Sequence, residues 1–288
     1  MNNNEKEFYK KEYFKIFEKT KNFNQAHSKN PLYFNFLKMM LTDNIIDDNI
    51  REIFFQSKQI SEINMKQSLS EIKNPKNMVG SLGCHEREET MIGLMRLENL
   101  QFCVEDVLRN NVEGDFIETG IWKGGACIFM RSFLKEYGNT EKIVYGADSF
   151  EGLPKPDVKN YPEDAEDSHY KMNELKVSLE QVKYNFEKYG LLDNQVKFLK
   201  GWFKDTLKEP PFEKLSILRM DGDMYESTIE ALENLYDKLS PGGYLIVDDY
   251  NYALGCKKAV DDFRNIKNIK EDIITIDWAS VYWKKNTI

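Results

Sequence analysis

The sequence predicts an α/β protein built on a mostly parallel β-sheet, and three stretches of the chain carry this prediction. Apolar runs at residues 216–220 and 243–247 resemble strands, and apolar residues recur between them at the spacing of a helix. A strand-like run at residues 115–120 leads into a glycine-rich turn and another helical pattern. Two final strand runs, 272–277 and 281–284, are separated by a tight turn and predict an antiparallel hairpin.

Composition and charge narrow the class of protein. With 288 residues, 41% of them hydrophobic and 31% charged, the chain is expected to be soluble and globular and can bury a sizeable core. The net charge of −8 argues against a nucleic-acid partner or an anionic membrane surface, since a polyanion needs a basic face. The sequence contains no run of 18 apolar residues, so no membrane span is predicted.

The cysteines and the N-terminus predict a cytoplasmic location. Cys84, Cys103, Cys127 and Cys256 show neither a C-x-x-C pair nor the spacing of a metal site, which is typical of reduced and mostly buried thiols. The first residues also lack the apolar region of a signal peptide.

The N-terminal part is predicted to be a helical extension or lid. Helical spacing occurs at residues 5–19, 32–42 and 46–57, and the polar, weakly periodic stretch that follows ends in a turn signal. We therefore place a boundary that separates this extension, residues 1–77, from a main domain, residues 78–288. Aromatic residues in the extension leave self-association into a homo-oligomer open.

The main domain begins with a predicted helix at about residues 91–110 and a nucleotide-binding type of turn. The strand that contains Glu118 is followed by Gly120 and Gly124, where the backbone can approach a ligand closely. This E-x-G-x-x-x-G spacing does not match the G-x-G-x-x-G of dinucleotide sites and suits the amino-acid end of S-adenosylmethionine, which carries no phosphate. A structural role for the glycines at the start of a helix remains the alternative.

A second strand, residues 142–148, ends in Asp148. A carboxylate at this place, 20 to 30 residues after the glycine turn, is positioned to accept hydrogen bonds from the two hydroxyl groups of a ribose. The alternative is a helix N-cap, which Asp148 and Ser149 would also provide.

The next stretch is a long, acidic connection at residues 150–176 that contains prolines and His169. Connections of this length in compact domains are often lids over a site or are disordered. His169 is a candidate base, although a solvated loop histidine is the more ordinary interpretation. A helix at residues 178–189 and a strand at 195–201 follow, and Trp202 after that strand would either stack on an adenine or fill the core.

The strongest chemical signal lies where the two central strands end. Asp221 and Asp223 follow one strand, Asp248 and Asp249 follow the next, and a parallel crossover brings both ends to the same edge of the sheet. Clustered carboxylates repel one another unless a cation compensates them, and their oxygens suit Mg²⁺. Helix caps and solvated side chains are the alternatives.

A helix at residues 256–266 precedes the final hairpin. A mostly parallel sheet with a hairpin that adds an antiparallel strand at its edge describes the Rossmann-like fold of S-adenosylmethionine methyltransferases. The motifs agree with this. Residues 118–126, 147–154, 219–228 and 248–250 resemble those of the macrocin O-methyltransferase family, and similarity extends over about residues 32–284.

This resemblance implies a seven-stranded sheet and an Mg²⁺-dependent transfer of a methyl group from S-adenosylmethionine to a sugar hydroxyl. It implies metal binding by Asp221, Asp248 and Asp249, with Asp223 as general base. The implied cofactor-binding set is Thr90, Met91, Glu118, Thr119, Gly120, Gly124, Asp148, Ser149, Gly201, Trp202 and Asp221.

The acceptor is less defined. Residues 1–31 match no part of the family pattern, and residues 81–87 replace its usual loop. An antibiotic sugar, a polysaccharide or a nucleotide-linked sugar would each fit as the acceptor. Two other functions remain: a glycosyltransferase that uses Asp221-Gly222-Asp223 as a D-x-D motif, and a methyltransferase-like scaffold without turnover.

Overall fold

The structure is a computed structural model that describes residues 28–42 and 88–286. Contacts divide it into two units, residues 1–99 and 100–288. The helices expected at residues 5–19 and 46–57, and the boundary expected at residue 77, lie outside the described residues. No helix in the described ranges is long and apolar enough to cross a membrane.

The first unit contains helix α2 (Pro31–Leu41), which confirms the helix expected at residues 32–42. The helix begins here because the side chain of Asn30 accepts a hydrogen bond from the Tyr33 N–H, and because Pro31 is favourable in the first turn. The carbonyl of Leu41 accepts hydrogen bonds from the N–H groups of Glu89 and Thr90. The segment before α5 is thereby tied to the end of α2.

The second unit is organised around a seven-stranded sheet with the order β3-β2-β1-β4-β5-β7-β6. Strands β1 to β5 are parallel, and β7 is antiparallel to both of its neighbours. The sheet is the Rossmann-like methyltransferase sheet that the sequence predicts. The strands are β1 (Asp115–Thr119), β2 (Val144–Asp148), β3 (Val196–Lys200), β4 (Leu215–Met220), β5 (Leu239–Val247), β6 (Ile274–Thr275) and β7 (Val281–Lys284).

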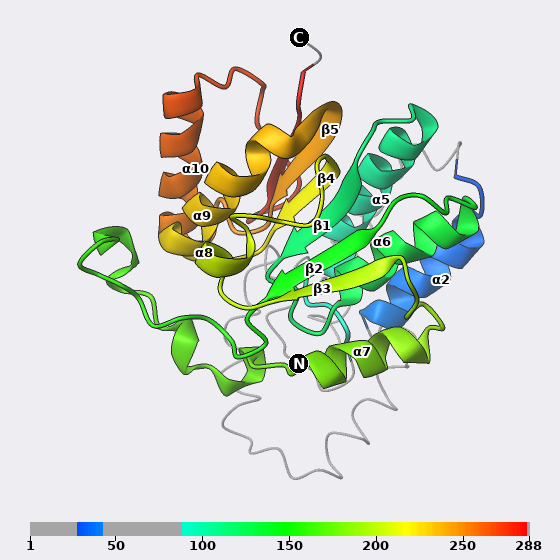
Figure 1. Ribbon diagram of the computed structural model, residues 1–288, viewed down its shortest axis with the longest axis horizontal. Helices are drawn as coiled ribbons and strands as arrows, with labels where there is room; N and C mark the ends of the chain where they lie inside the picture. The colour runs from blue at the N-terminus through cyan, green and yellow to red at the C-terminus, as the bar shows by residue number, and fades with distance from the viewer. Residues whose placement is uncertain (1–27, 43–87, 287–288) are drawn as a thin grey trace, which may run out of the picture. The chain divides into compact units, whose positions relative to one another are not determined.

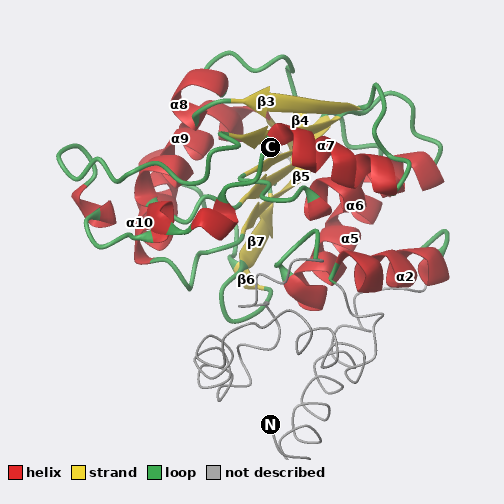
Figure 2. Ribbon diagram, turned by 90° about the horizontal axis from the view of Figure 1, so that it is seen from below, coloured by secondary structure: helices red, strands yellow, loops and turns green. Residues whose placement is uncertain are grey.

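Helices cover both faces of this sheet (Figures 1 and 2). Helices α8, α9 and α10 pack on one face, and α6, α7 and the part of α5 after residue 99 lie on the other. Buried apolar side chains between these layers form the core. The helices are α5 (Gly93–Arg109), α6 (Gly125–Glu136), α7 (Leu179–Lys188), α8 (Phe203–Thr206), α9 (Tyr225–Leu235) and α10 (Leu254–Lys267).

One detail differs from the expectations. Leu239 fits the helical spacing that precedes it, yet it is the first residue of β5 and pairs with Leu215 before the register shifts. One apolar residue at an element boundary fits both the repeat of a helix and the alternation of a strand. Its spacing in the sequence therefore does not tell which of the two elements contains Leu239.

The final hairpin adds antiparallel strands at the edge of the parallel strands, as expected, and β7 is the strand that pairs with β5, between it and the two-residue strand β6. Val281, Tyr282 and Trp283 of β7 are buried, whereas Ile274 and Thr275 of β6 are exposed. The more apolar strand takes the interior position because it buries more apolar surface there.

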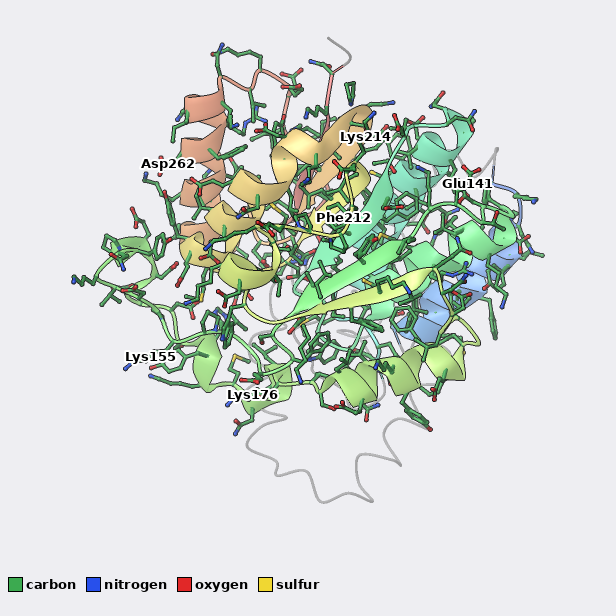
Figure 3. All side chains as sticks on the ribbon, viewed as in Figure 1. Glu141, Lys155, Lys176, Phe212, Lys214 and Asp262 are labelled. Atoms are coloured by element: carbon green, nitrogen blue, oxygen red, sulfur yellow. The ribbon has the colours of Figure 1, made fainter. Side chains whose placement is uncertain are left out.

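The acidic connection at residues 150–176 folds into three short 3₁₀ turns, η3 (Pro162–Asp164), η4 (His169–Lys171) and η5 (Asn173–Leu175). Lys155 and Lys176, near its two ends, are labelled in Figure 3 and lie on the surface. The connection reaches the beginning of α9 and thereby the end of the sheet that carries the acidic residues.

Candidate functional site

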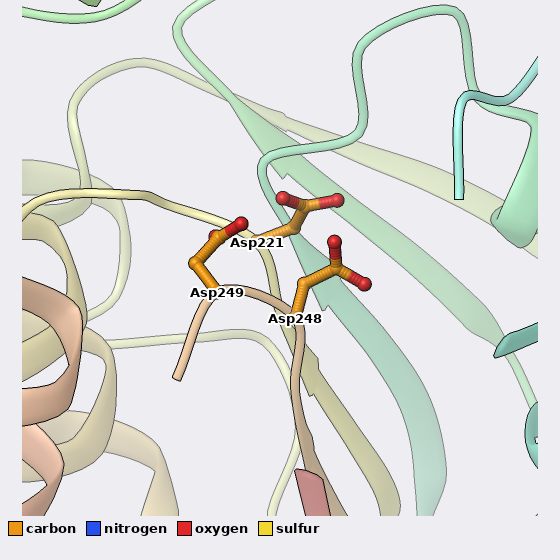
Figure 4. A group of neighbouring side chains, drawn as sticks. All are labelled: Asp221, Asp248 and Asp249. Carbon is orange, nitrogen blue, oxygen red and sulfur yellow. The ribbon is translucent and has the colours of Figure 1, made fainter. Parts of the chain in front are cut away.

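Three carboxylates converge at the carboxyl ends of β4 and β5 (Figure 4). Asp221 follows β4, Asp248 and Asp249 follow β5, and the last residues of these strands, Met220 and Val247, are paired. One oxygen of each carboxylate lies within 4.8 Å of the others. Hard oxygen ligands of this kind could hold Mg²⁺. The metal binding expected from the sequence stays a prediction.

Arg219 lies beneath this cluster and is 1% exposed. Its Nη1 donates to Oε1 of Glu118 at 2.5 Å and to Oδ2 of Asp221 at 2.9 Å, and its Nη2 donates to Asp248. Burial alone would lower the pKa of Arg219, but the three carboxylates outweigh it and raise the pKa above its ordinary value. One permanent cation therefore compensates part of the negative charge.

Sequence reasoning assigned no role to Arg219. The signal that points to it is a charged residue inside an otherwise apolar strand, since such a charge is buried only when it is paired.

Glu118 ends β1 and is also buried. Its Oε1 accepts the hydrogen bond from Arg219, and its Oε2 accepts one from Sγ of Cys127 at 3.0 Å. Burial raises the pKa of Glu118 to about 7, although Arg219 acts in the opposite direction. Both oxygens of Glu118 therefore have partners within the protein, and its contact with a cofactor stays a prediction.

The glycine turn is required by the close approach of β1 and β4. Gly120 has φ +81°, and a Cβ there would lie 1.7 Å from the carbonyl oxygen of Asp221. Thr119, just before it, is buried, and its carbonyl accepts the Asp221 N–H at 2.8 Å. Gly124, with φ +87°, precedes the first residue of α6. Only glycine fits at residue 120, so the turn brings the backbone of the predicted cofactor site against the metal cluster.

Asp148 lies at the end of β2, beside the glycine turn. Its Oδ2 accepts the N–H of Ile121 at 2.8 Å, and its Oδ1 accepts that of Phe150 at 2.7 Å. Burial raises its pKa, against the effect of these bonds. Ser149 accepts the N–H of Glu151 and closes the next turn. No helix begins at Asp148, so it is not a helix N-cap; its carboxylate instead holds the glycine turn and the turn that follows β2. Hydrogen bonding to ribose stays a prediction.

The remaining predicted cofactor residues lie in two places. Gly201 follows β3, and its N–H donates to the carbonyl of Asp148 at 2.9 Å, so Trp202 is close to the end of β2. Trp202 is partly buried and precedes α8. Thr90 and Met91 belong to the first unit, where the Thr90 side chain accepts the N–H of Ile92. Cofactor contacts of these four residues stay predictions.

Asp223, the predicted base, lies beside the carboxylate cluster in an unusual backbone conformation. It has φ +57°, and its N–H donates to Oδ2 of Asp249 at 3.2 Å. Such a conformation is uncommon for a residue other than glycine and is often found at functional sites. Burial and the charge of Asp221 raise the pKa of Asp223 to about 7, while His169 lowers it. A carboxylate that titrates near neutral pH suits proton transfer.

The structure brings His169 into electrostatic contact with Asp223. Oδ2 of Asp167 lies 2.7 Å from Nδ1 of His169, and Oδ1 accepts the His169 backbone N–H at 2.9 Å. The bond to Asp167 raises the pKa of His169, burial lowers it, and the charge of Asp223 raises it again. The charge of His169 thus interacts with that of the predicted base, an interaction that the sequence left open.

Asp164 holds this connection in place and was not recognised from the sequence. Its Oδ1 accepts the N–H of Tyr225 at 2.6 Å and its Oδ2 that of Glu226 at 3.0 Å, which caps α9 from 61 residues away. Met224, at the N-cap position of α9, provides no side-chain cap. Because the partners are distant in sequence, no local capping pattern could reveal this bond.

Comparisons with known proteins identify the family of the chain. The family model described as Macrocin-O-methyltransferase (TylF) matches residues 30–285. Demethyldecarbamoylnovobiocin O-methyltransferase of Streptomyces niveus is 52% identical over 197 residues, 68% of this chain and 75% of the relative. A Streptomyces olivaceus enzyme, 8-demethyl-8-(2,3-dimethoxy-alpha-L-rhamnosyl)-tetracenomycin-C 4'-O-methyltransferase, is 52% identical over 196 residues, 68% of this chain and 75% of that relative.

Among solved structures, the O-methyltransferase NovP is similar with a TM-score of 0.76 and 40% identity, covering 90% of this chain and 100% of NovP. The family supports S-adenosylmethionine as methyl donor and argues against the glycosyltransferase interpretation of the D-x-D motif. From its motifs, its sheet and these relatives, the chain belongs to the Macrocin-O-methyltransferase (TylF) family and is an O-methyltransferase.

Proposed function

We propose that the protein transfers the methyl group of S-adenosylmethionine to a hydroxyl group of a sugar, with Mg²⁺ held by Asp221, Asp248 and Asp249. The observation that carries this proposal is the convergence of these carboxylates beside Asp223 and the glycine turn. A relative that is 52% identical is named for methylating a rhamnosyl-bearing compound, which supports a sugar as the acceptor.

Each step of the reaction has a residue suited to it. Bound Mg²⁺ would lower the pKa of an acceptor hydroxyl and help to orient it. Asp223 accepts the proton of that hydroxyl while the oxygen forms its bond to the methyl carbon and the carbon–sulfur bond breaks, leaving S-adenosylhomocysteine. The products are a methyl ether and a protonated Asp223, which returns its proton to solvent.

The cofactor is proposed to bind across the ends of β1, β2 and β3. The turn after Glu118 would face its amino-acid end, Asp148 its ribose, and Trp202 its adenine. Placing the sulfonium methyl close to the carboxylate cluster would align the reacting atoms, an effect that contributes several kcal/mol in comparable reactions.

Titration calorimetry with S-adenosylmethionine and S-adenosylhomocysteine tests this proposal. We expect both to bind in Mg²⁺ and in EDTA, since the predicted cofactor residues, apart from Asp221, lie outside the metal cluster. UDP-glucose serves as the control and is expected not to bind. Failure of both cofactors to bind under either condition would overturn the proposed function. The cytoplasmic location, the absence of a nucleic-acid partner and the homo-oligomer stay predictions.

A further inference from the structure

Three segments of the second unit meet beside the carboxylate cluster. The first directly follows β5, where the N–H of Tyr252 donates to the carbonyl of Asp249 at 3.0 Å. The second is the turn between β6 and β7, where Oγ of Ser280 donates to the carbonyl of Asp248 at 2.5 Å. A bond of 2.7 Å from the N–H of Asn251 to the carbonyl of Ala279 joins the two segments. Both are therefore fastened to the backbone of the predicted metal ligands.

The third segment is the acidic connection that carries His169. Asp164 fastens it to the beginning of α9, and Asp164 is itself only 2% exposed. Gly255, at the start of α10, packs so closely that a Cβ there would lie 2.6 Å from Oδ1 of Asp164. Asp167 then holds His169 through one hydrogen bond to its backbone N–H and one to Nδ1 of its ring. The position of the His169 ring is thus set by Asp167, within a connection that Asp164 holds against α9.

Aromatic rings from these three segments lie next to one another. The ring centroids of Tyr252 and Trp278 are 5.5 Å apart with an interplanar angle of 87°, and those of His169 and Tyr252 are 6.2 Å apart. Tyr252 is 45% exposed although it lies three residues after Asp249. An exposed aromatic side chain, supported from two sides and adjacent to a catalytic centre, is well placed to contact a ligand.

We propose that Tyr252, flanked by Trp278 and His169, forms the surface on which the ring of an uncharged acceptor sugar packs. One face of a pyranose ring presents C–H groups, which pack on an aromatic ring, while its hydroxyl groups project to the sides. The neighbouring carboxylates of Asp167 and Asp223 accept hydrogen bonds from such hydroxyls and disfavour an anionic ligand. This inference rests on the proposed function and names the residues that select its acceptor.

Saturation-transfer NMR with methyl α-L-rhamnopyranoside tests this inference on the full chain with Mg²⁺ and S-adenosylhomocysteine present. We expect the wild-type protein to transfer saturation to the C–H protons of the sugar. Tyr252→Ala should weaken sugar binding roughly three- to tenfold, and Tyr252→Phe should retain it because the aromatic ring remains. Tyr184→Ala, which removes a 56% exposed tyrosine on α7, is the matched control and should bind like the wild type.

The outcomes separate this inference from the proposed function. Binding of S-adenosylhomocysteine to Tyr252→Ala with unchanged Kd shows that the variant is folded and the cofactor site intact. Equal sugar binding by the wild type and a folded Tyr252→Ala would overturn the inference, as would absence of sugar binding to the cofactor-bound wild type. Absence of cofactor binding to the wild type would instead overturn the proposed function.

Discussion

Arg219 contributes one positive charge where Glu118, Asp221 and Asp248 converge. A buried carboxylate without a compensating cation becomes protonated rather than charged, and it would then be a poor ligand for Mg²⁺. At the scale of single residues, the site therefore depends on Arg219 as well as on the acids that would hold the metal. Asp223 differs from these acids because it has no bond to Arg219 among the hydrogen bonds of the described residues. Burial and the charge of Asp221 raise its pKa to about 7.

Replacing Asp223 by Asn should abolish its role as base without removing its shape. We expect kcat for acceptor methylation to fall by at least about 100-fold, the usual size of a general-base contribution, while the Kd of S-adenosylhomocysteine stays unchanged. In the wild type, kcat should decrease as the pH falls below about 7, because protonated Asp223 cannot accept a proton. Mg²⁺ would lower the pKa of Asp223 and move this midpoint to a lower pH.

Single-turnover rates measured across pH for the wild type and Asp223→Asn check this expectation. Asp205→Asn, which removes the charge of an exposed acid on α8, is the control. Methylation by Asp223→Asn at the wild-type rate would show that another group is the base, and His169 would be examined next.

At the scale of elements, α9 depends on a residue outside its own sequence. The helix starts directly after the Asp221–Asp223 segment, and the Asp164 carboxylate satisfies two of the N–H groups that a helix leaves without partners. A negative charge at this end also interacts favourably with the helix dipole. The same residue holds the connection that carries His169, so helix stability and site geometry are linked through Asp164.

Replacing Asp164 by Ala should therefore lower the free energy of unfolding by about 1–2 kcal/mol, the range for loss of a helix cap. It should also raise the KM for the acceptor more than the Kd of S-adenosylhomocysteine, because the connection lies on the acceptor side in the proposed site. Denaturant unfolding and acceptor kinetics measure the two effects. Glu166→Ala, an exposed acid in the same connection, is the control. Equal stability of Asp164→Ala and Glu166→Ala would contradict the capping role.

At the scale of the whole molecule, the metal cluster is a product of the sheet. Asp221 and Asp248 are adjacent only because β4 and β5 are paired in parallel and end at the same level. Ser280, which precedes β7, donates to the backbone and side chain of Asp248 and adds support from the antiparallel strand. The site therefore needs strands from different parts of the chain. Its affinity for a metal ion depends on the correct folding of the whole domain.

Asp248→Asn should weaken Mg²⁺ binding roughly tenfold or more. Even the loss of a residue that only hydrogen-bonds to a metal ligand lowers metal affinity by about tenfold or more, and loss of a ligand should lower it at least as much. Calorimetric titration of Mg²⁺ into the cofactor-bound protein measures this change. Asp237→Asn, which removes an exposed charge before the start of β5, at the opposite end of that strand from Asp248, is the matched control. If Asp248→Asn binds Mg²⁺ as tightly as the wild type does, Asp248 is not a ligand.

The sequence by itself determined the fold class, the order of the strands along the chain and the acids that follow β4 and β5, because periodicity and strand ends are local properties. Tertiary structure alone decided that Arg219 pairs with Glu118 and Asp248, and that the charges of His169 and Asp223 interact. It also decided that β7, and not β6, is the strand that pairs with β5. These features depend on which distant segments of the chain become neighbours. Burial of a charge costs free energy unless the charge is paired, and burial of an apolar strand lowers the free energy of the folded protein.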